Sequence, residues 1–216
     1  SDADLECGSQ PSGDVETADD MTRRGVSPCQ VHNNCSGKHT GFLCQARHIG
    51  APTEGYVDVA HPVQKRVAEA IADLADEELS SFAIDGCSAP NFGMSLTGLA
   101  RSMARIASAE TSLTGARAEA AIALRTAKAA HPFEVAGEGR ACTTLMRAGD
   151  GLVVKTGAEG AVTAILPDQG LGIALKINDG RTEAAEVAMT SILVALGALD
   201  PADPRVGALL SPQLMN

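Results

Sequence analysis

Residues 151–177, which read GLVVKTGAEGAVTAILPDQGLGIALKI, alternate three short β-rich runs with two turn-like segments. The runs cover 151–156, 161–166 and 171–177, and the segments TGAEG and PDQG separate them. Short runs of this kind, joined by turns that contain glycine or proline, are typical of neighbouring strands in an antiparallel sheet. The stretch therefore predicts an antiparallel meander.

Predicted helices precede and follow this meander. Helical spacing of apolar residues, together with proline at helix starts and glycine at helix ends, predicts helices over 14–24, 38–48, 62–75, 95–109, 115–130 and 182–198. A further strand is predicted over 81–84, leading into a loop over 85–90. Helices, a meander and a covering C-terminal helix make an α+β domain. We predict one domain over 1–216, with a mainly helical part over 1–135 and the meander and its helix over 136–216.

Composition excludes several classes of partner. The chain has 216 residues, of which 44% are hydrophobic, so it can bury a substantial core. Its net charge of −10 at pH 7 would repel nucleic acid and anionic membrane surfaces. No apolar stretch approaches the roughly 20 residues of a membrane span, and no targeting peptide opens the chain, so we expect a cytoplasmic protein.

The six cysteines are scattered along a long chain, which favours free thiols over a disulfide framework. We expect some of them to be buried and one or two to be reactive or metal-bound. Four are expected to be packing or loop thiols, namely Cys7, Cys29, Cys44 and Cys142.

The segment HNNCSGKHTG at residues 32–41 concentrates side chains that can do chemistry at the start of a predicted helix. It is not a phosphate-binding loop, because His32 stands where that loop needs glycine and His39 stands where it needs a hydroxyl. Cys35 and Lys38 are three residues apart, so one helical turn can direct both at one point. A helix N-terminus favours a thiolate, which zinc accepts readily, although burial as a small apolar residue is the commoner role of cysteine. His39 could be a rival ligand, a substrate contact or a structural hydrogen-bonding residue.

Lys155-Thr156-Gly157 lies in the first strand of the meander. In serine β-lactamases and penicillin-binding proteins this tripeptide occupies a strand beside the cleft where an acyl group is attacked. A lysine at a strand end is also commonly a solvated charge. The partner motif of those enzymes is Ser-x-x-Lys, and no serine of the 216 residues has lysine three positions later. Ser102 is followed at that distance by Arg105, whose guanidinium cannot act as a base.

Four separated blocks together resemble the asparaginase II family, the rhizobial-type L-asparaginases. They are His32 to His39, Asp85-Gly86-Cys87 with Ala89-Pro90, Gly139 to Cys142, and Val154 to Gly160. The resemblance implies a β-lactamase-like and penicillin-binding-protein-like fold, in which helices cover an antiparallel sheet. It also implies a homodimer that hydrolyses L-asparagine to L-aspartate and ammonia.

The resemblance also implies roles for particular residues of this sequence. Lys155 corresponds to a catalytic lysine, and the expected substrate-binding residues are His39, Asp85, Thr156 and Gly157. Zinc is expected at Cys35, Lys38 and Cys87, where it would orient substrate or hold two loops together. The catalytic serines and a second lysine belong to an N-terminal portion that these 216 residues do not contain, so we expect the chain to be the C-terminal part of such an enzyme.

Three alternatives belong to other functional classes. One is a serine hydrolase directed at β-lactams, which the missing Ser-x-x-Lys weakens equally. A second is a thiol amidohydrolase with Cys35 as nucleophile and His39 or Lys38 as base. A third is a remnant that binds zinc or dimerises and performs no chemistry.

Overall fold

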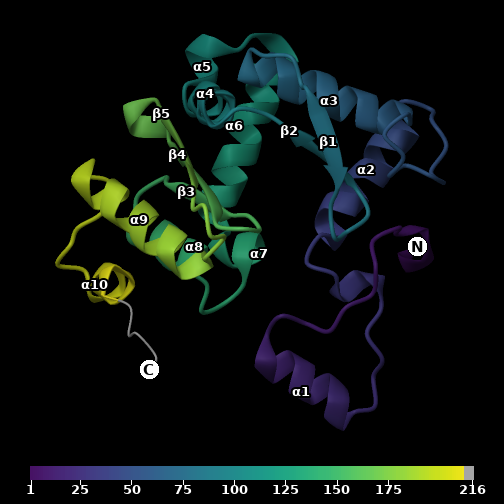
Figure 1. The fold of residues 1–216 in the computed structure, drawn as a ribbon, viewed down its shortest axis with the longest axis horizontal. Helices are drawn as coiled ribbons and strands as arrows, with labels where there is room; N and C mark the ends of the chain where they lie inside the picture. Colours follow the sequence, from purple (N-terminus) through teal and green to yellow (C-terminus); the bar gives the residue numbers. More distant parts are fainter. Residues whose placement is uncertain (212–216) are drawn as a thin grey trace. The chain divides into compact units, whose positions relative to one another are not determined.

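The computed structural model describes residues 1–211, which form two compact units (Figure 1). Unit 1 comprises residues 1–73 and 77–94, and unit 2 comprises residues 74–76 and those from 95 onward. The chain is α+β, with two small antiparallel sheets and many helices, as the sequence predicts. The more specific prediction of a β-lactamase-like fold stays a prediction.

Unit 1 combines a two-stranded hairpin with helices. Its elements are η1 (Asp2–Asp4), α1 (Val15–Arg23), η2 (Gln30–His32), α2 (Ser36–His48), α3 (Pro62–Ala75, whose last residues belong to unit 2), β1 (Ser81–Ile84) and β2 (Pro90–Gly93). A small apolar core of Leu5, Cys7, Cys87 and Ala89 is buried here, and Cys35, Phe42 and Leu43 pack against it. Helix α2 therefore contributes one apolar side to the same core as the loop between the strands.

Strand β2 corrects the prediction of a loop that runs through residue 90. Pro90 pairs with Ile84 of β1, and the antiparallel register continues to Gly93 opposite Ser81. The sequence PNFG has no alternation of apolar and polar residues, so only pairing with β1 makes it a strand. Proline is tolerated because it occupies the first strand position.

Unit 2 is built on the three-stranded sheet that the sequence predicts. Its strands are β3 (Val153–Thr156), β4 (Ala161–Leu166) and β5 (Leu171–Lys176), and β4 lies between the other two in antiparallel register. The 3-10 helix η3 (Pro167–Gln169) and Gly170, whose φ is +60°, form the turn from β4 to β5. The predicted antiparallel meander is thus confirmed.

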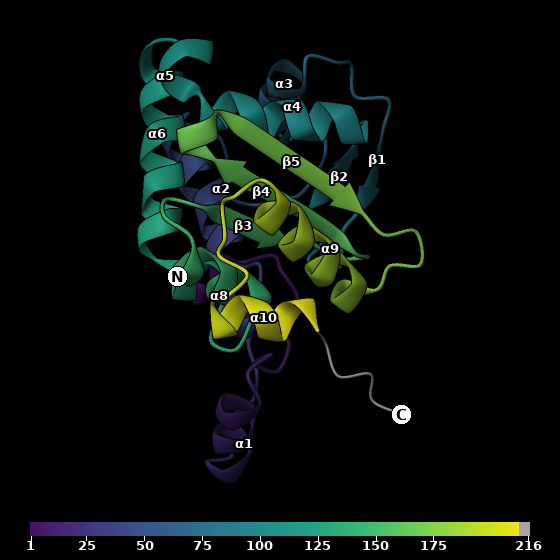
Figure 2. The same ribbon diagram turned by 90° about the vertical axis from the view of Figure 1, so that its left-hand side faces the viewer.

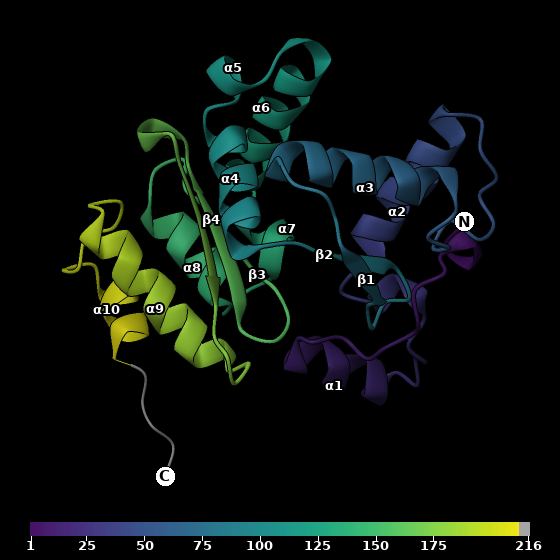
Figure 3. The ribbon, with the colours of Figure 1, turned by 45° about the horizontal axis from the view of Figure 1, so that its top comes forward.

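Helices cover both faces of this sheet. Helices α8 (Ala141–Ala148) and α9 (Thr182–Ala195) lie on one face, and α4 (Leu96–Ala107) and α6 (Gly115–Ala130) lie on the other (Figure 3). Figure 2 shows α9 crossing in front of the strands. The main core of unit 2 fills the space between these layers and includes Leu145, Val154, Ala164, Met189 and Leu193.

The helix predictions hold within a few residues, but the described residues contain further short helices. Helix α6 ends at the predicted place before His131-Pro132, whereas α9 ends at Ala195 instead of residue 198. Gly197 explains the earlier end, because its φ of +71° lets the amides of Gly197 and Ala198 bond back to Val194 and Leu193. Sequence patterns did not predict α7 (Pro132–Ala136), α8 or α10 (Pro204–Leu210), and α5 (Ala109–Ser112) follows α4 directly.

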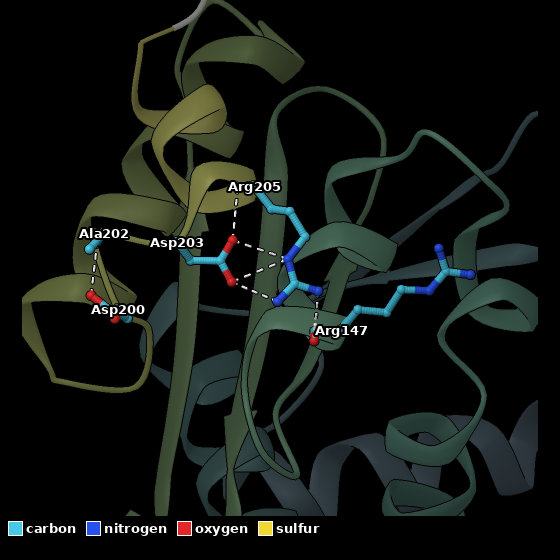
Figure 4. Close-up of polar contacts among 5 residues, drawn as sticks. All are labelled: Arg147, Asp200, Ala202, Asp203 and Arg205. Carbon is cyan, nitrogen blue, oxygen red and sulfur yellow. Dashed lines mark hydrogen bonds and ion pairs between the residues drawn. The ribbon is translucent and has the colours of Figure 1, made fainter.

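Helix α10 is held by polar contacts at its start (Figure 4). The Asp203 carboxylate accepts a hydrogen bond from the Arg205 backbone amide at 2.8 Å and pairs with the Arg205 guanidinium at 2.6 Å. The same guanidinium donates to the Arg147 carbonyl oxygen at 3.1 Å, near the end of α8. These contacts anchor α10 to α8. Among residues 1–211, no helix is long and apolar enough to cross a membrane.

Candidate functional site

Two predicted zinc-site residues, Cys35 and Lys38, lie at the start of α2. Cys35 is the N-cap residue, and its backbone amide donates to the Asn33 side chain at 2.8 Å. Lys38 lies within the first turn, and its Nζ donates a hydrogen bond to Cys87 Sγ at 3.0 Å. The helix start thus brings both side chains toward the loop between β1 and β2.

The loop between β1 and β2 supplies Asp85 and Cys87. The amide of Ser88 donates to the Asp85 carbonyl oxygen, and Ser88 adopts a φ of +72°, so the chain turns tightly at this point. Cys87 Sγ donates to Asp85 Oδ2 at 3.4 Å, and Asp85 Oδ2 lies 3.7 Å from Lys38 Nζ. The tight turn therefore presents one thiol and one carboxylate to Lys38.

One thiol of α2 and these two loop groups are close enough to share a cation. The Sγ atoms of Cys35 and Cys87 and a carboxylate oxygen of Asp85 all lie within 4.8 Å of one another. Cys87 is only 4% exposed, whereas the side chains of Lys38 and Asp85 are each 41% exposed. The group is therefore anchored in the core of unit 1 and open to solvent on its Lys38 and Asp85 side.

Burial and neighbouring charges shift the pKa values of Cys35 and Lys38. Burial raises the pKa of the Cys35 thiol, and the Lys38 ammonium only partly offsets that increase. For Lys38, burial lowers the pKa, but the hydrogen bond to Cys87 and the neighbouring Cys35, Cys87 and Asp85 outweigh burial and raise it above the usual value. Lys38 is therefore an ammonium in the metal-free protein. It must lose a proton before it can bind a metal.

His39 follows Lys38 on α2 and is fully buried. Its Nδ1 forms a 2.7 Å hydrogen bond with the Tyr56 hydroxyl, which also accepts from the Glu6 amide at 2.7 Å. Burial lowers the pKa of His39, and the Lys38 charge lowers it further. Within residues 1–211, Nε2 has no hydrogen-bond partner, and it is buried, so neither ring nitrogen is exposed for the predicted substrate contact.

Lys155, Thr156 and Gly157 lie in unit 2, on and just after the edge strand β3. Lys155 is exposed, and its Nζ donates to the Thr156 carbonyl oxygen at 2.5 Å. The Thr156 hydroxyl and Cys142 Sγ are 2.8 Å apart, and the Thr156 amide donates to the same sulfur at 3.1 Å. The buried Cys142 of α8 thus fixes the strand residue that follows Lys155.

Tyr56 and Cys142 extend the residue set expected from the sequence. Tyr56 is the single tyrosine of the chain and is fully buried, but it lies outside any helix or strand, so no periodic pattern marks it. Cys142 belongs to one of the four blocks that carried the family resemblance, although only a packing role was expected for it. Its place in that block was the signal in the sequence that could have identified Cys142 as a residue near the site.

Comparison with known proteins decides the family. A family model described as L-asparaginase II matches residues 1–216, the full sequence. The chain belongs to the L-asparaginase II family. No curated protein matches this L-asparaginase II chain. Membership points to an amidohydrolase of the L-asparaginase type, with asparagine as the substrate class.

Proposed function

We propose that this L-asparaginase II chain contributes to the hydrolysis of L-asparagine to L-aspartate and ammonia by a serine-lysine mechanism. The observation that carries the proposal is the family match over residues 1–216. The cluster of Cys35, Asp85, Cys87 and Lys38 supports a metal site in the same protein. The predicted homodimer belongs to this proposal as well, and sedimentation of the purified chain tests it.

Lys155 is the proposed catalytic residue of this chain. In the proposed reaction a serine hydroxyl attacks the side-chain amide, ammonia leaves, and water then releases aspartate. Lys155 Nζ would accept or return the serine proton, and Thr156 and Gly157 would shape the adjacent wall. The 2.5 Å hydrogen bond to the Thr156 carbonyl oxygen restrains the Lys155 amine on its own strand.

The residues of unit 1 fit a zinc ion by the chemistry of their donors. Two thiols within 4.8 Å of each other and of a carboxylate form a set that zinc accepts once the thiols are deprotonated. Cys35 and Cys87 would hold the ion, joined by Asp85 or, after loss of a proton, by Lys38. The bound zinc would supply a fixed positive charge that orients substrate groups or holds the α2 start against the β1–β2 loop.

Ammonia release from L-asparagine tests the catalytic part, measured with a protein that joins this chain to the Ser-x-x-Lys segment that the proposed mechanism requires. Lys155→Ala is expected to abolish release, whereas Lys176→Ala is the matched control and should leave it unchanged. Lys176 is an exposed lysine on β5 of the same sheet, and its Nζ likewise donates to the carbonyl oxygen of the following residue, at 2.6 Å. Undiminished release by the Lys155 variant of an active parent would contradict the assigned role, and L-glutamine in parallel assays measures substrate preference.

Zinc content tests the metal part separately. We expect one zinc per chain, lost in Cys35→Ser and Cys87→Ser and retained in Cys44→Ser, because Cys44 is exposed and lies outside the cluster. Zinc binding without ammonia release would support the non-catalytic alternative. The thiol-hydrolase alternative gains no support from the geometry, since Lys38 bonds to Cys87 and His39 Nδ1 bonds to Tyr56.

A further inference from the structure

We propose that Cys35 and Cys87 form a reversible intramolecular disulfide when the cluster holds no metal and a peroxide is available. The inference uses the residues of the proposed metal site, but the bond itself does not depend on whether zinc binds. It gives the cluster a second chemical state. It also concerns a different property from hydrolysis.

The distance between the two sulfur atoms carries the inference. They lie within 4.8 Å of each other, and a disulfide bond is about 2.0 Å long. Cys35 precedes the first turn of α2, and Cys87 lies in a five-residue loop, 85–89, between β1 and β2. Both side chains thus come from the ends of elements, where rotation of the side chain and small loop movements can close the remaining gap.

Other partners for Cys87 are less well placed. Cys7 belongs to the same apolar core, but its thiol donates to the Gln30 carbonyl oxygen and it is not part of the 4.8 Å group formed by described residues. Cys44 is exposed on α2. Lys38 Nζ is near Cys87 Sγ, at 3.0 Å, so an oxidised Cys87 could in principle bond to nitrogen. Cys35 is the better partner than Lys38, because it offers a nearby thiol and thiols condense readily with a sulfenic acid.

The chemistry balances with hydrogen peroxide as the oxidant. One thiol sulfur attacks the peroxide, the O–O bond breaks, and a sulfenic acid and one water form. The second thiol then attacks the sulfenic sulfur, so that the S–S bond forms and a second water leaves. Two electrons pass from the two sulfurs to the peroxide, and both thiol protons end in water. A dithiol reductant reverses the bond by exchange.

Disulfide formation and metal binding exclude each other. Zinc binds thiolate sulfur, and the bond consumes both thiols of the cluster. Only Asp85 and Lys38 would remain, and their charges already pair with each other at 3.7 Å. Peroxide is therefore expected to prevent zinc binding, and bound zinc is expected to protect both cysteines from peroxide.

Mass spectrometry of the metal-free, reduced chain after treatment with hydrogen peroxide tests the inference. The six free thiols should fall to four, the intact mass should fall by about 2 Da, and digestion should release one peptide pair joined through Cys35 and Cys87. Reduction should restore all six thiols. The zinc-loaded chain should keep six thiols under the same treatment.

Variants and alternative products make the outcome decisive. Cys44→Ser should still form the bond, whereas Cys35→Ser and Cys87→Ser should not, and peptide mapping of the unaltered chain remains informative if either variant fails to fold. Gain of oxygen without a crosslink, a Cys7 to Cys87 pair, or a Cys87 to Lys38 bond would each overturn the inference. A disulfide in a chain that binds no zinc would support the inference and refute the metal site. Zinc binding by a chain that forms no disulfide in its metal-free state would support the metal site and refute the inference.

Discussion

At the scale of single residues, Tyr56 stabilises the region behind the cysteine cluster. Its hydroxyl is the shared partner of His39 Nδ1 and the Glu6 amide, and its ring packs edge-on against His39. Its carbonyl oxygen accepts from the buried Gln64 side chain at 2.8 Å. Through its side chain and its backbone carbonyl group, this one residue connects the N-terminal segment, α2 and α3.

Tyr56→Phe is expected to destabilise the protein by about 1–3 kcal/mol, because it keeps the ring but leaves the buried His39 Nδ1 and the part-buried Glu6 amide without this partner. Urea unfolding followed by circular dichroism measures the change. Thr40→Ala is the control, since Thr40 is exposed on α2 and its hydroxyl donates only to Ser36 of the same helix. The control should remain within about 0.5 kcal/mol of the parent. Equal effects in the two variants would show that the Tyr56 hydroxyl does not stabilise the fold.

The cluster itself shows how far sequence reasoning extends at this scale. Lys38 and Cys87 are 49 residues apart, and no spacing rule pairs them. The family resemblance predicted that they would meet, whereas composition and periodicity could not. The resemblance predicted that Asp85 binds substrate. In the structure its carboxylate lies among the candidate metal donors. That placement depends on the tight turn at Ser88, which the sequence does not reveal.

At the scale of secondary-structure elements, the packing of α4 on β5 depends on one glycine. A Cβ at Gly172 would lie 2.0 Å from the Ala104 amide nitrogen and 2.4 Å from the Met103 carbonyl carbon, both backbone atoms of α4. Backbone in a packed helix cannot yield locally, so the helix must separate from the sheet. Gly172 therefore sets the distance between these two elements.

Gly172→Ala is expected to destabilise unit 2 by about 3 kcal/mol or more, at the upper end of the cost of overpacking. Gly37→Ala is the matched control, because Gly37 lies within α2 and a Cβ there meets no atom within 4 Å. The control should stabilise the protein by about 0.5–1 kcal/mol, since glycine is a poor helix residue. Thermal unfolding of both variants measures the difference. A Gly172 variant as stable as the parent would contradict the described contact.

Helix α9 offers a prediction about pH. Burial and the neighbouring Glu183 raise the pKa of Glu186, and Arg140 opposes this only in part. The folded state therefore disfavours the ionised carboxylate of Glu186. The contribution of Glu186 to stability is complete below its unfolded pKa of about 4.3, and it is lost as the pH rises through its higher folded pKa. Glu186→Gln should be more stable than the parent at pH 7, and the advantage should disappear near pH 4. Unfolding experiments across pH measure the difference, with Glu119→Gln on the exposed side of α6 as the surface control.

The elements that sequence analysis missed are those whose stability comes from their neighbours. Helix α10 has seven residues, too few to be stable alone, and it depends on its Asp203 cap and the contact of Arg205 with α8. Strand β2 has no periodicity of its own and depends on β1. The meander was predictable because each of its strands is short, apolar and bounded by turn residues.

At the scale of the whole molecule, the candidate metal donors and Lys155 belong to different units. All four cluster residues belong to unit 1, and Lys155, Thr156 and Gly157 belong to unit 2. The sequence could not predict this division, because the boundary depends on contacts between residues far apart in the chain. Residues 74–76 illustrate the point, since they belong to unit 2 although the sequence on both sides of them belongs to unit 1.

Zinc is therefore expected to stabilise the molecule unevenly. At a free concentration about 100 times its dissociation constant, a ligand that binds only the folded state adds about 2.7 kcal/mol. Because every proposed donor lies in unit 1, hydrogen exchange should slow most at the start of α2 and in the loop 85–89, and much less in β3, β4 and β5. Cys87→Ser should show neither the stabilisation nor the local protection. Protection by zinc that is as strong in the three-stranded sheet as in the loop would show that the ion binds elsewhere.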